Sequence, residues 1–319
     1  RVWDNQNNVS SWSLPAFWEM GLLQASDWRA KWIEPGYTED SVMRPSPYFR
    51  KTFTVNKKIQ SARLYITSHG LYEAYLNFNR VGSKVLTPGW TSYNKRLQYQ
   101  VYDVTDLLQQ DGNAIGIVLG NGWYRGNLVW EGRRDIYGKD LGVLAQLQLE
   151  YADGSSDKVV SDESWKSNTG AIKYSEIYHG EIQDARSERQ GWVSATYNDA
   201  DWKGVQVKEH SKNNLVATYN EPIQKHEVVE PVKIFTTAKG ENVIDFGQNL
   251  VGWVQVNIKG KAGDSVTIYH AEVLDKEGNF YSDNLRAAKQ KNIYVLKGGE
   301  EEHFEPHFTF QGFRYIKIE

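Results

Sequence analysis

Apolar and polar residues alternate over many short segments of the chain. Leu64 and Ile66 face one side of residues 62–67, and the same period of two recurs over 254–259 and 266–270. This period is typical of half-buried antiparallel strands. Turn sequences that contain glycine separate such segments, at 152–155, 259–264, 276–279 and 297–299. The pattern predicts an all-β fold of tandem antiparallel β-sandwich domains, jelly-roll-like in outline.

Helical patterns are few and short. Residues 103–108 and 285–289 each have the pattern of one or two helical turns, and no long amphipathic helix follows from the sequence. No apolar run approaches the roughly 18 residues that a membrane-spanning helix needs. The sequence therefore predicts neither a helical scaffold nor a membrane span.

Three regions are expected along the chain. Residues 1–26 are typical of the end of a preceding module followed by a linker. Residues 27–218 are expected to form one large β-domain, and residues 223–319 a second sandwich after a linker near Pro222. The chain starts at Arg1 rather than Met and stops on a strand-like segment. We therefore expect that it is cut from a longer protein.

The composition points to carbohydrate and away from nucleic acid. The chain has 12 Trp and 19 Tyr, the side chains that stack on sugar faces, although most are expected to fill the core. Lys and Arg number 37 against 40 Asp and Glu, and the net charge of −3 argues against nucleic acid and against a polybasic membrane contact. The absence of cysteine excludes disulfides and thiolate chemistry.

No self-sufficient catalytic motif is present. The sequence has no phosphate-binding loop and no Gly-x-Ser-x-Gly elbow. His303 and His307 lie four residues apart, but Pro306 predicts extended chain, which favours a surface strand over a metal pair. A glycosidase needs two carboxyl groups across a sugar, and the sequence alone cannot pair any, such as Glu73 and Asp245. No catalytic residue is therefore assigned.

Residues 119–126 form the most distinctive loop, with glycines around polar and aromatic residues. Those glycines would let the backbone turn sharply at a strand end. The loop would present an amide, an indole, a phenol and a guanidinium, those of Asn121, Trp123, Tyr124 and Arg125. Sugar hydroxyls can bond to the amide and the guanidinium, while an apolar sugar face can stack on a ring. The alternative is that the loop fixes a domain interface, and both readings stay open.

Several motifs resemble bacterial α-L-rhamnosidases, glycoside hydrolase family 78. The first half of the chain is similar to their N-terminal domain at 70–77, 87–93, 102–108 and 119–126. The second half is similar to their concanavalin-like domain at 245–253, 270–275 and 306–315. The resemblance runs from about residue 17 to residue 319 in the family's order, and residues 1–26 resemble the end of a fibronectin-like module.

The resemblance implies a function for the parent protein. Members hydrolyse terminal α-L-rhamnose with inversion, and their acid and base lie in an (α/α)6 barrel after the concanavalin-like domain. The scarcity of helices indicates that this chain lacks that barrel, so the fragment itself is expected to be inactive. The implied partners are a rhamnose-containing oligosaccharide or glycoside and the protein's own catalytic domain. A periplasmic or extracellular location in a bacterium is expected from the family's role in plant glycan breakdown.

The resemblance also bears on cofactors. No cofactor is expected to be required, but in some relatives a related β-domain binds rhamnose through a calcium ion. By position, Glu73 and Asn121 are the expected ligands, because a carboxylate and an amide oxygen suit a hard cation. Two other functions stay open, a stand-alone carbohydrate-binding module and an adhesin-like structural protein whose aromatic residues all lie in the core.

Overall fold

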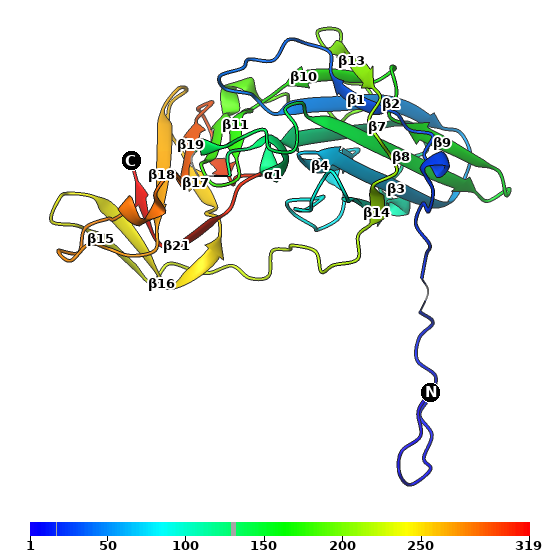
Figure 1. Cartoon of the computed structure of the whole chain (residues 1–319), viewed down its shortest axis with the longest axis horizontal. Coiled ribbons are helices and arrows are strands. Elements are labelled where there is room, and N and C mark those ends of the chain that lie inside the picture. The colour runs from blue at the N-terminus through cyan, green and yellow to red at the C-terminus, as the bar shows by residue number, and fades with distance from the viewer. Residues whose placement is uncertain (17, 129–131) are drawn as a thin grey trace.

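The computed structural model describes residues 1–16, 18–128 and 132–319 (Figure 1). Its regular structure is almost all strand, so the predicted all-β fold is confirmed. The helical elements whose bounds lie in the described residues are one short α-helix and four 3₁₀ turns: α1 (Gly122–Arg125), η1 (Ala25–Asp27), η2 (Thr105–Leu107), η4 (Ala185–Ser187) and η5 (Asp283–Leu285). No helix in this part of the chain is long and apolar enough to cross a membrane.

One continuous sheet of twelve strands folds over itself to build the first domain. Its order is β14 (Leu215–Ala217), β6 (Leu97–Asp103), β3 (Ile59–His69), β8 (Gly142–Tyr151), β1 (Trp32–Pro35), β13 (Lys203–Lys208), β10 (Lys166–Thr169), β2 (Pro47–Val55), β7 (Asp111–Gly120), β4 (Leu71–Leu76) and β5 (Asn79–Arg80), with β9 (Ser156–Val160) beside β8. Strand β13 joins the two layers, because residues 205–208 pair with β1 and residues 203–204 pair with β10.

The apolar faces of these two layers enclose the first core. Leu64 and Ile66 of β3 are fully buried and meet Ile115 and Ile117 from β7 of the opposite layer. The alternation seen in the sequence therefore places one face of β3 inward, as expected for a strand that is half-buried.

The second domain has a sheet of seven strands and a smaller one of two. The order of the larger sheet is β11 (Ile172–Glu176), β12 (Gly180–Asp184), β19 (Lys291–Val295), β18 (Ser265–Ala271), β21 (Gln311–Ile318), β16 (Asn242–Gly252) and β15 (Lys233–Thr236). The smaller sheet pairs β17 (Val256–Ile258) with β20 (Glu302–Phe304). Phe304 from the smaller sheet and Phe313 and Ile316 from the larger one pack into a common core.

The β11–β12 hairpin crosses from the first domain into the second sheet. Strand β12 pairs in parallel with β19, so that residues 182–184 lie beside residues 293–295. The hydrogen-bonded sheet of the second domain therefore includes a segment from inside the predicted range 27–218. We use "first domain" for the twelve-stranded sandwich and "second domain" for the two smaller sheets together with this hairpin.

The two domains lie side by side, and the N-terminal segment runs away from both (Figure 1). Before η1, the described residues form a single isolated bridge, between Trp3 and Val9. The segment between β14 and β15 runs along one side of the molecule from the first domain to the second.

Candidate functional site

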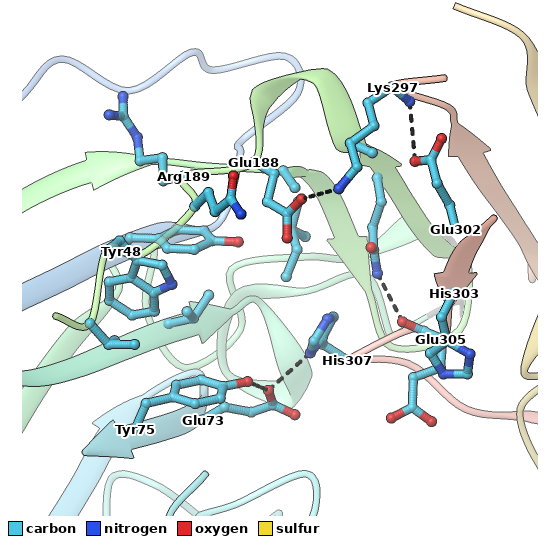
Figure 2. Close-up of a pocket in the computed structure, with 18 of the residues that line it drawn as sticks. Tyr48, Glu73, Tyr75, Glu188, Arg189, Lys297, Glu302, His303, Glu305 and His307 are labelled. Carbon is cyan, nitrogen blue, oxygen red and sulfur yellow. Dashed lines mark hydrogen bonds and ion pairs between the residues drawn. The ribbon is translucent and has the colours of Figure 1, made fainter. Parts of the chain in front are cut away.

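A cavity of about 570 Å³ lies where the two domains meet (Figure 2). The first domain contributes the aromatic side chains of Tyr48, Tyr75, Phe78 and Trp192, and the second domain lines it mainly with charged side chains. The residues that matter most below are Tyr48, Glu73, Tyr75 and Trp192 from the first domain, with Lys297 and His307 from the second. We call this space the interdomain cavity.

Strand β4 supplies the floor of the cavity because its residues alternate between two faces. Tyr72, Ala74 and Leu76 are buried in the first domain. Glu73 and Tyr75 therefore point to the opposite face, toward the second domain. The Tyr75 hydroxyl donates a hydrogen bond of 2.6 Å to Glu73 Oε2, which fixes the carboxylate (Figure 2).

An ion pair across the domain boundary occupies this floor. Nδ1 of His307 lies 2.9 Å from Glu73 Oε2, and the Arg80 guanidinium reaches Glu73 Oε1 at 3.4 Å. His307 belongs to the segment that connects β20 to β21. The pair therefore links β4 of the first domain to the second domain at a site that is largely shielded from water.

The pair shifts the pKa of both partners. Burial alone would raise the pKa of Glu73, but the charge and hydrogen bond of His307 outweigh it and lower the pKa to about 2. Burial alone would lower the pKa of His307, but the Glu73 carboxylate, with help from Glu181 and Glu305, raises it to about 9. At neutral pH the floor therefore carries an imidazolium beside a carboxylate.

Three aromatic rings form a wall of the cavity on the side of the first domain. The Tyr48 and Trp192 rings meet edge to face with centroids 5.2 Å apart, and the Tyr75 and Trp192 centroids are 6.0 Å apart. Strand β2 positions Tyr48, and Arg50 Nε of the same strand donates to the Trp192 carbonyl at 2.9 Å. The wall is held by backbone contacts as well as by ring packing.

Charged residues occupy the rim. Lys297 Nζ lies 2.9 Å from Glu188 Oε2, an ion pair that joins the second domain to the segment after η4 (Figure 2). Glu305 accepts hydrogen bonds from Lys225 and Gln255 of the second-domain side. The rim groups thus have protein partners while they face the opening of the cavity.

Glu181 lies behind the floor and organises the segment that carries His307. It is fully buried in β12, and its carboxylate accepts the backbone N–H groups of His307 and Phe308 at 3.0 to 3.2 Å. Burial raises the pKa of this carboxyl group. The hairpin that completes the second sheet therefore also holds His307 in place.

The predicted sugar-binding loop folds inward rather than outward. Its four side chains are nearly inaccessible, with exposed fractions of 1% for Asn121, 5% for Trp123, 8% for Tyr124 and 2% for Arg125. They present almost no surface to a ligand in this structure, and sugar binding by them stays a prediction.

A buried polar network explains why the amide and the guanidinium of this loop are enclosed. Arg125 Nε donates a hydrogen bond of 2.5 Å to Asn121 Oδ1. The two terminal nitrogens of Arg125 donate hydrogen bonds of 2.6 and 3.0 Å to the Glu39 carboxylate. The Asn121 amide donates to Glu176 Oε1 at 2.9 Å, and Arg134 donates to the same carboxylate at 2.6 Å. Buried charges of this kind are stable when each has partners.

The aromatic residues of the loop meet the second domain. Trp123 Nε1 donates to the Tyr178 hydroxyl at 3.2 Å, and the Trp123 ring packs against Phe310. Gly120 lies directly against the Phe308 ring, where an added Cβ would overlap it. These contacts are those of a loop that fixes the domain interface, which was the alternative left open by the sequence.

Trp90 is the exposed aromatic residue beside this loop. Its side chain is 51% exposed and stacks on Trp123 with ring centroids 5.8 Å apart and planes 6° apart. Its Nε1 donates to the Tyr137 hydroxyl at 3.3 Å. The outer face of this indole is therefore held in a fixed orientation toward solvent.

The two residues expected to bind calcium lie in separate networks. Glu73 is bound by His307, Tyr75 and Arg80, whereas the Asn121 oxygen accepts from Arg125. Among the described residues, no group of three or more His, Asp or Glu side chains is placed to hold a metal ion. The pair does not fit a shared cation in this arrangement.

Sequence reasoning missed most of the interdomain cavity. It singled out Glu73, but for calcium, and it read His307 as part of a surface strand. The structure ends β20 at Phe304, exposes His303, and turns His307 toward the first domain. The alternation in β4 is the signal that could have placed Glu73 and Tyr75 on one outward face. No local signal pairs that face with His307, which lies 234 residues away.

Two family profiles match this chain. The profile described as the α-L-rhamnosidase N-terminal domain matches residues 57–227, and the bacterial α-L-rhamnosidase concanavalin-like domain matches residues 235–319. An α-L-rhamnosidase of Streptomyces avermitilis is 42% identical over 82% of this chain and 26% of its own length. One from Formosa agariphila is 35% identical over 100% of this chain and 36% of its own length.

Solved structures agree with these relatives. The native α-L-rhamnosidase of Aspergillus terreus superposes with a TM-score of 0.92 at 42% identity, over 94% of this chain and 35% of that one. The Streptomyces avermitilis α-L-rhamnosidase in complex with L-rhamnose gives a TM-score of 0.82 at 41% identity, over 86% of this chain and 27% of that one. The chain thus spans about a quarter to a third of the relatives that it matches.

Proposed function

The chain belongs to the bacterial α-L-rhamnosidase family, and on that premise we propose that it is a non-catalytic β-sandwich region of an inverting α-L-rhamnosidase. In this proposal the parent protein removes terminal α-L-rhamnose from plant-type glycans. Its acid and base belong to a helical domain outside these residues. The two β-domains support that domain and offer a surface to rhamnose-containing glycans.

The state of two carboxyl groups at the domain boundary, Glu73 and Glu181, supports the non-catalytic role. A glycosidase needs a carboxyl group that is both protonated near neutral pH and open to the substrate. Burial raises the pKa of Glu181, but that side chain is fully enclosed and accepts backbone N–H groups. Glu73 faces the cavity, but with a pKa of about 2 it is ionised and cannot donate a proton. Neither residue combines the two properties.

Exposed apolar residues on the second sandwich favour the idea that a further domain covers this surface. Val232 and Ile234 point the same way at the start of β15, and their side chains are 67% and 71% exposed. Strand β15 is also the edge of the larger sheet, so its outer backbone groups lack a neighbouring strand. Exposed apolar residues on a sheet edge are typical of a surface that a further domain covers.

Turnover of an aryl α-L-rhamnoside tests the proposal. We expect the purified chain to show no hydrolysis above buffer, while the Streptomyces avermitilis relative, assayed in parallel, releases the aryl group. Clear hydrolysis by the chain alone would place an acid and a base inside these β-domains. For the longer parent protein, NMR of the first-formed sugar anomer checks inversion. A chain that binds sugar but has no hydrolytic parent would instead be a stand-alone carbohydrate-binding module.

A further inference from the structure

We propose that the interdomain cavity is a binding site for a neutral saccharide, with an L-rhamnosyl residue as the preferred occupant. The choice of rhamnose rests on the proposed function, whereas the choice of a neutral sugar rests on the cavity itself. This site differs from the 119–126 loop in position, in residues and in having no need for a cation.

The space is large enough for one or two sugar rings. Its volume is about 570 Å³, which lies within the range of roughly 300 to 1,000 Å³ that small-molecule sites occupy. Such sites form preferentially at domain interfaces. A ligand here would contact both sandwiches at once.

The aromatic wall suits the apolar face of a sugar. The Tyr48 and Tyr75 rings each meet the Trp192 ring edge to face, with centroids 5.2 and 6.0 Å from that of Trp192, so the wall presents ring faces and edges at several angles. Trp192 is only partly buried, which leaves part of the indole open to the cavity. A 6-deoxy sugar has a methyl group in place of a hydroxymethyl group, and that methyl group gains from contact with such a surface.

The floor and the rim offer hydrogen bonds in fixed positions. Glu73 Oε1 receives only a long bond of 3.4 Å from Arg80, so it keeps capacity to accept from a sugar hydroxyl. Glu188 and Lys297 hold each other at 2.9 Å across the opening and provide one acceptor and one donor group. Gln190, an exposed residue of the lining, adds an amide that both donates and accepts.

The charges favour a neutral ligand over an ionic one. Carboxylates lining the cavity outnumber the cations that face it, which disfavours a phosphate or a uronate. Two of these carboxylates, Glu73 and Glu188, already have cationic partners in His307 and Lys297, so neither needs a bound cation to neutralise it. A polyhydroxylated neutral ring uses both kinds of group without leaving a charge unpaired.

Isothermal titration calorimetry with methyl α-L-rhamnoside tests the site, using two matched tryptophan substitutions. Gln190→Trp places a bulky ring in the cavity from an exposed position, so the core should stay intact. Gln206→Trp makes the same change at an exposed position of β13, away from the cavity. Thermal melts of both variants verify that each is folded. We expect the wild type and Gln206→Trp to bind within twofold of each other, and Gln190→Trp to lose at least tenfold in affinity.

Each contrary result has a distinct meaning. Equal binding by Gln190→Trp and the wild type would show that the cavity is not the site. The sugar would then bind elsewhere, for example at Trp90. Loss of binding on adding a chelator would overturn it in favour of a calcium site. Absence of binding by the wild type would overturn it as well. None of these results changes the aryl rhamnoside assay, so failure of the site and failure of the proposed function are separate observations.

Discussion

His307 of the second domain and Glu73 of the first form an ion pair in which the imidazole Nδ1 lies 2.9 Å from the carboxylate. The side chains are 33% and 11% exposed, so the pair is shielded without being sealed from water. Each residue shifts the pKa of the other, so we expect the cohesion of the two domains to depend on pH.

Stability should fall on the alkaline side as His307 loses its proton. Its pKa is raised from 6.5 to about 9 in the folded protein, so its contribution is complete below pH 6.5 and lost as the pH rises through 9. Glu73 has a lowered pKa of about 2, so its contribution is complete above pH 4.5 and lost as the pH falls through 2. We expect thermal melts to show the pair's full contribution between about pH 4.5 and 6.5.

The variant His307→Gln isolates this effect. It should remove a decrease on the order of 1 kcal/mol between pH 6.5 and 9, a size that allows for solvent screening. His303→Gln is the matched control, because His303 is exposed on β20 and bonds only to Asn257 among the contacts described. An identical alkaline slope in the wild type and His307→Gln would contradict the role of the pair.

The close approach of Gly120 and Phe308 predicts a strong coupling between these two positions. Phe308→Ala should cost about 3–5 kcal/mol, because the ring is 1% exposed and leaves a cavity when removed. Gly120→Ala should also destabilise, since its new methyl group would overlap the Phe308 ring.

A double-mutant cycle measured by urea unfolding tests this coupling. In the double variant the alanine at 120 occupies space that the ring has vacated, so its total cost should be below the sum of the two single costs. Strict additivity would show that Gly120 is required for another reason. The substitution Gly154→Ala is unsuitable as a control, because Gly154 has a positive φ of 81°.

Asn121→Ala should destabilise the chain by about 1–3 kcal/mol, because it leaves Arg125 and Glu176 with unmet hydrogen bonds in a buried network. Asn213→Ala, at an exposed position, should change the free energy of unfolding by no more than about 0.5 kcal/mol. Chemical denaturation of both variants provides the comparison. Equal stability of the two variants would mean that the Asn121 network is not structural, and would favour its role as a ligand-binding group.

Local periodicity made three individual strands predictable, β3, β17 and β18. Leu64 and Ile66 are buried in β3, and Ile268 and His270 are buried in β18, as their alternation indicated. The short helical pattern at 103–108 became the 3₁₀ turn η2. These features depend on neighbours within a few residues, which is the range over which sequence patterns carry information.

The helical turn expected at 285–289 is displaced to Asp283–Leu285, where Arg286 ends it with a φ of 56°.

Contacts between distant segments could not be predicted from the sequence in the same way. The parallel pairing of Ile182 with Ile293 depends on how two domains dock, and nothing in either segment alone specifies it. The buried state of the 119–126 loop likewise follows from Phe308 and Phe310, which lie far along the chain.

The second sandwich should not fold without the β11–β12 hairpin. Residues 223–319 alone would lose two strands of the larger sheet and the Glu181 carboxylate that holds the segment around His307. We expect this fragment to show no cooperative thermal transition by circular dichroism. A peptide of residues 170–187, added in trans, should restore a transition, and a scrambled peptide should not. Cooperative unfolding of the fragment without the peptide would contradict this.

The shared hairpin constrains how such proteins can be recombined. The family profiles divide the chain between residues 227 and 235, but the strands that complete the second sheet are encoded before that point. A chimera joined at the profile boundary would combine β12 of one parent with β19 of another and would mismatch their contact surface. The two sandwiches are therefore expected to be inherited together, as one unit of exchange, even though the sequence presents them as two modules.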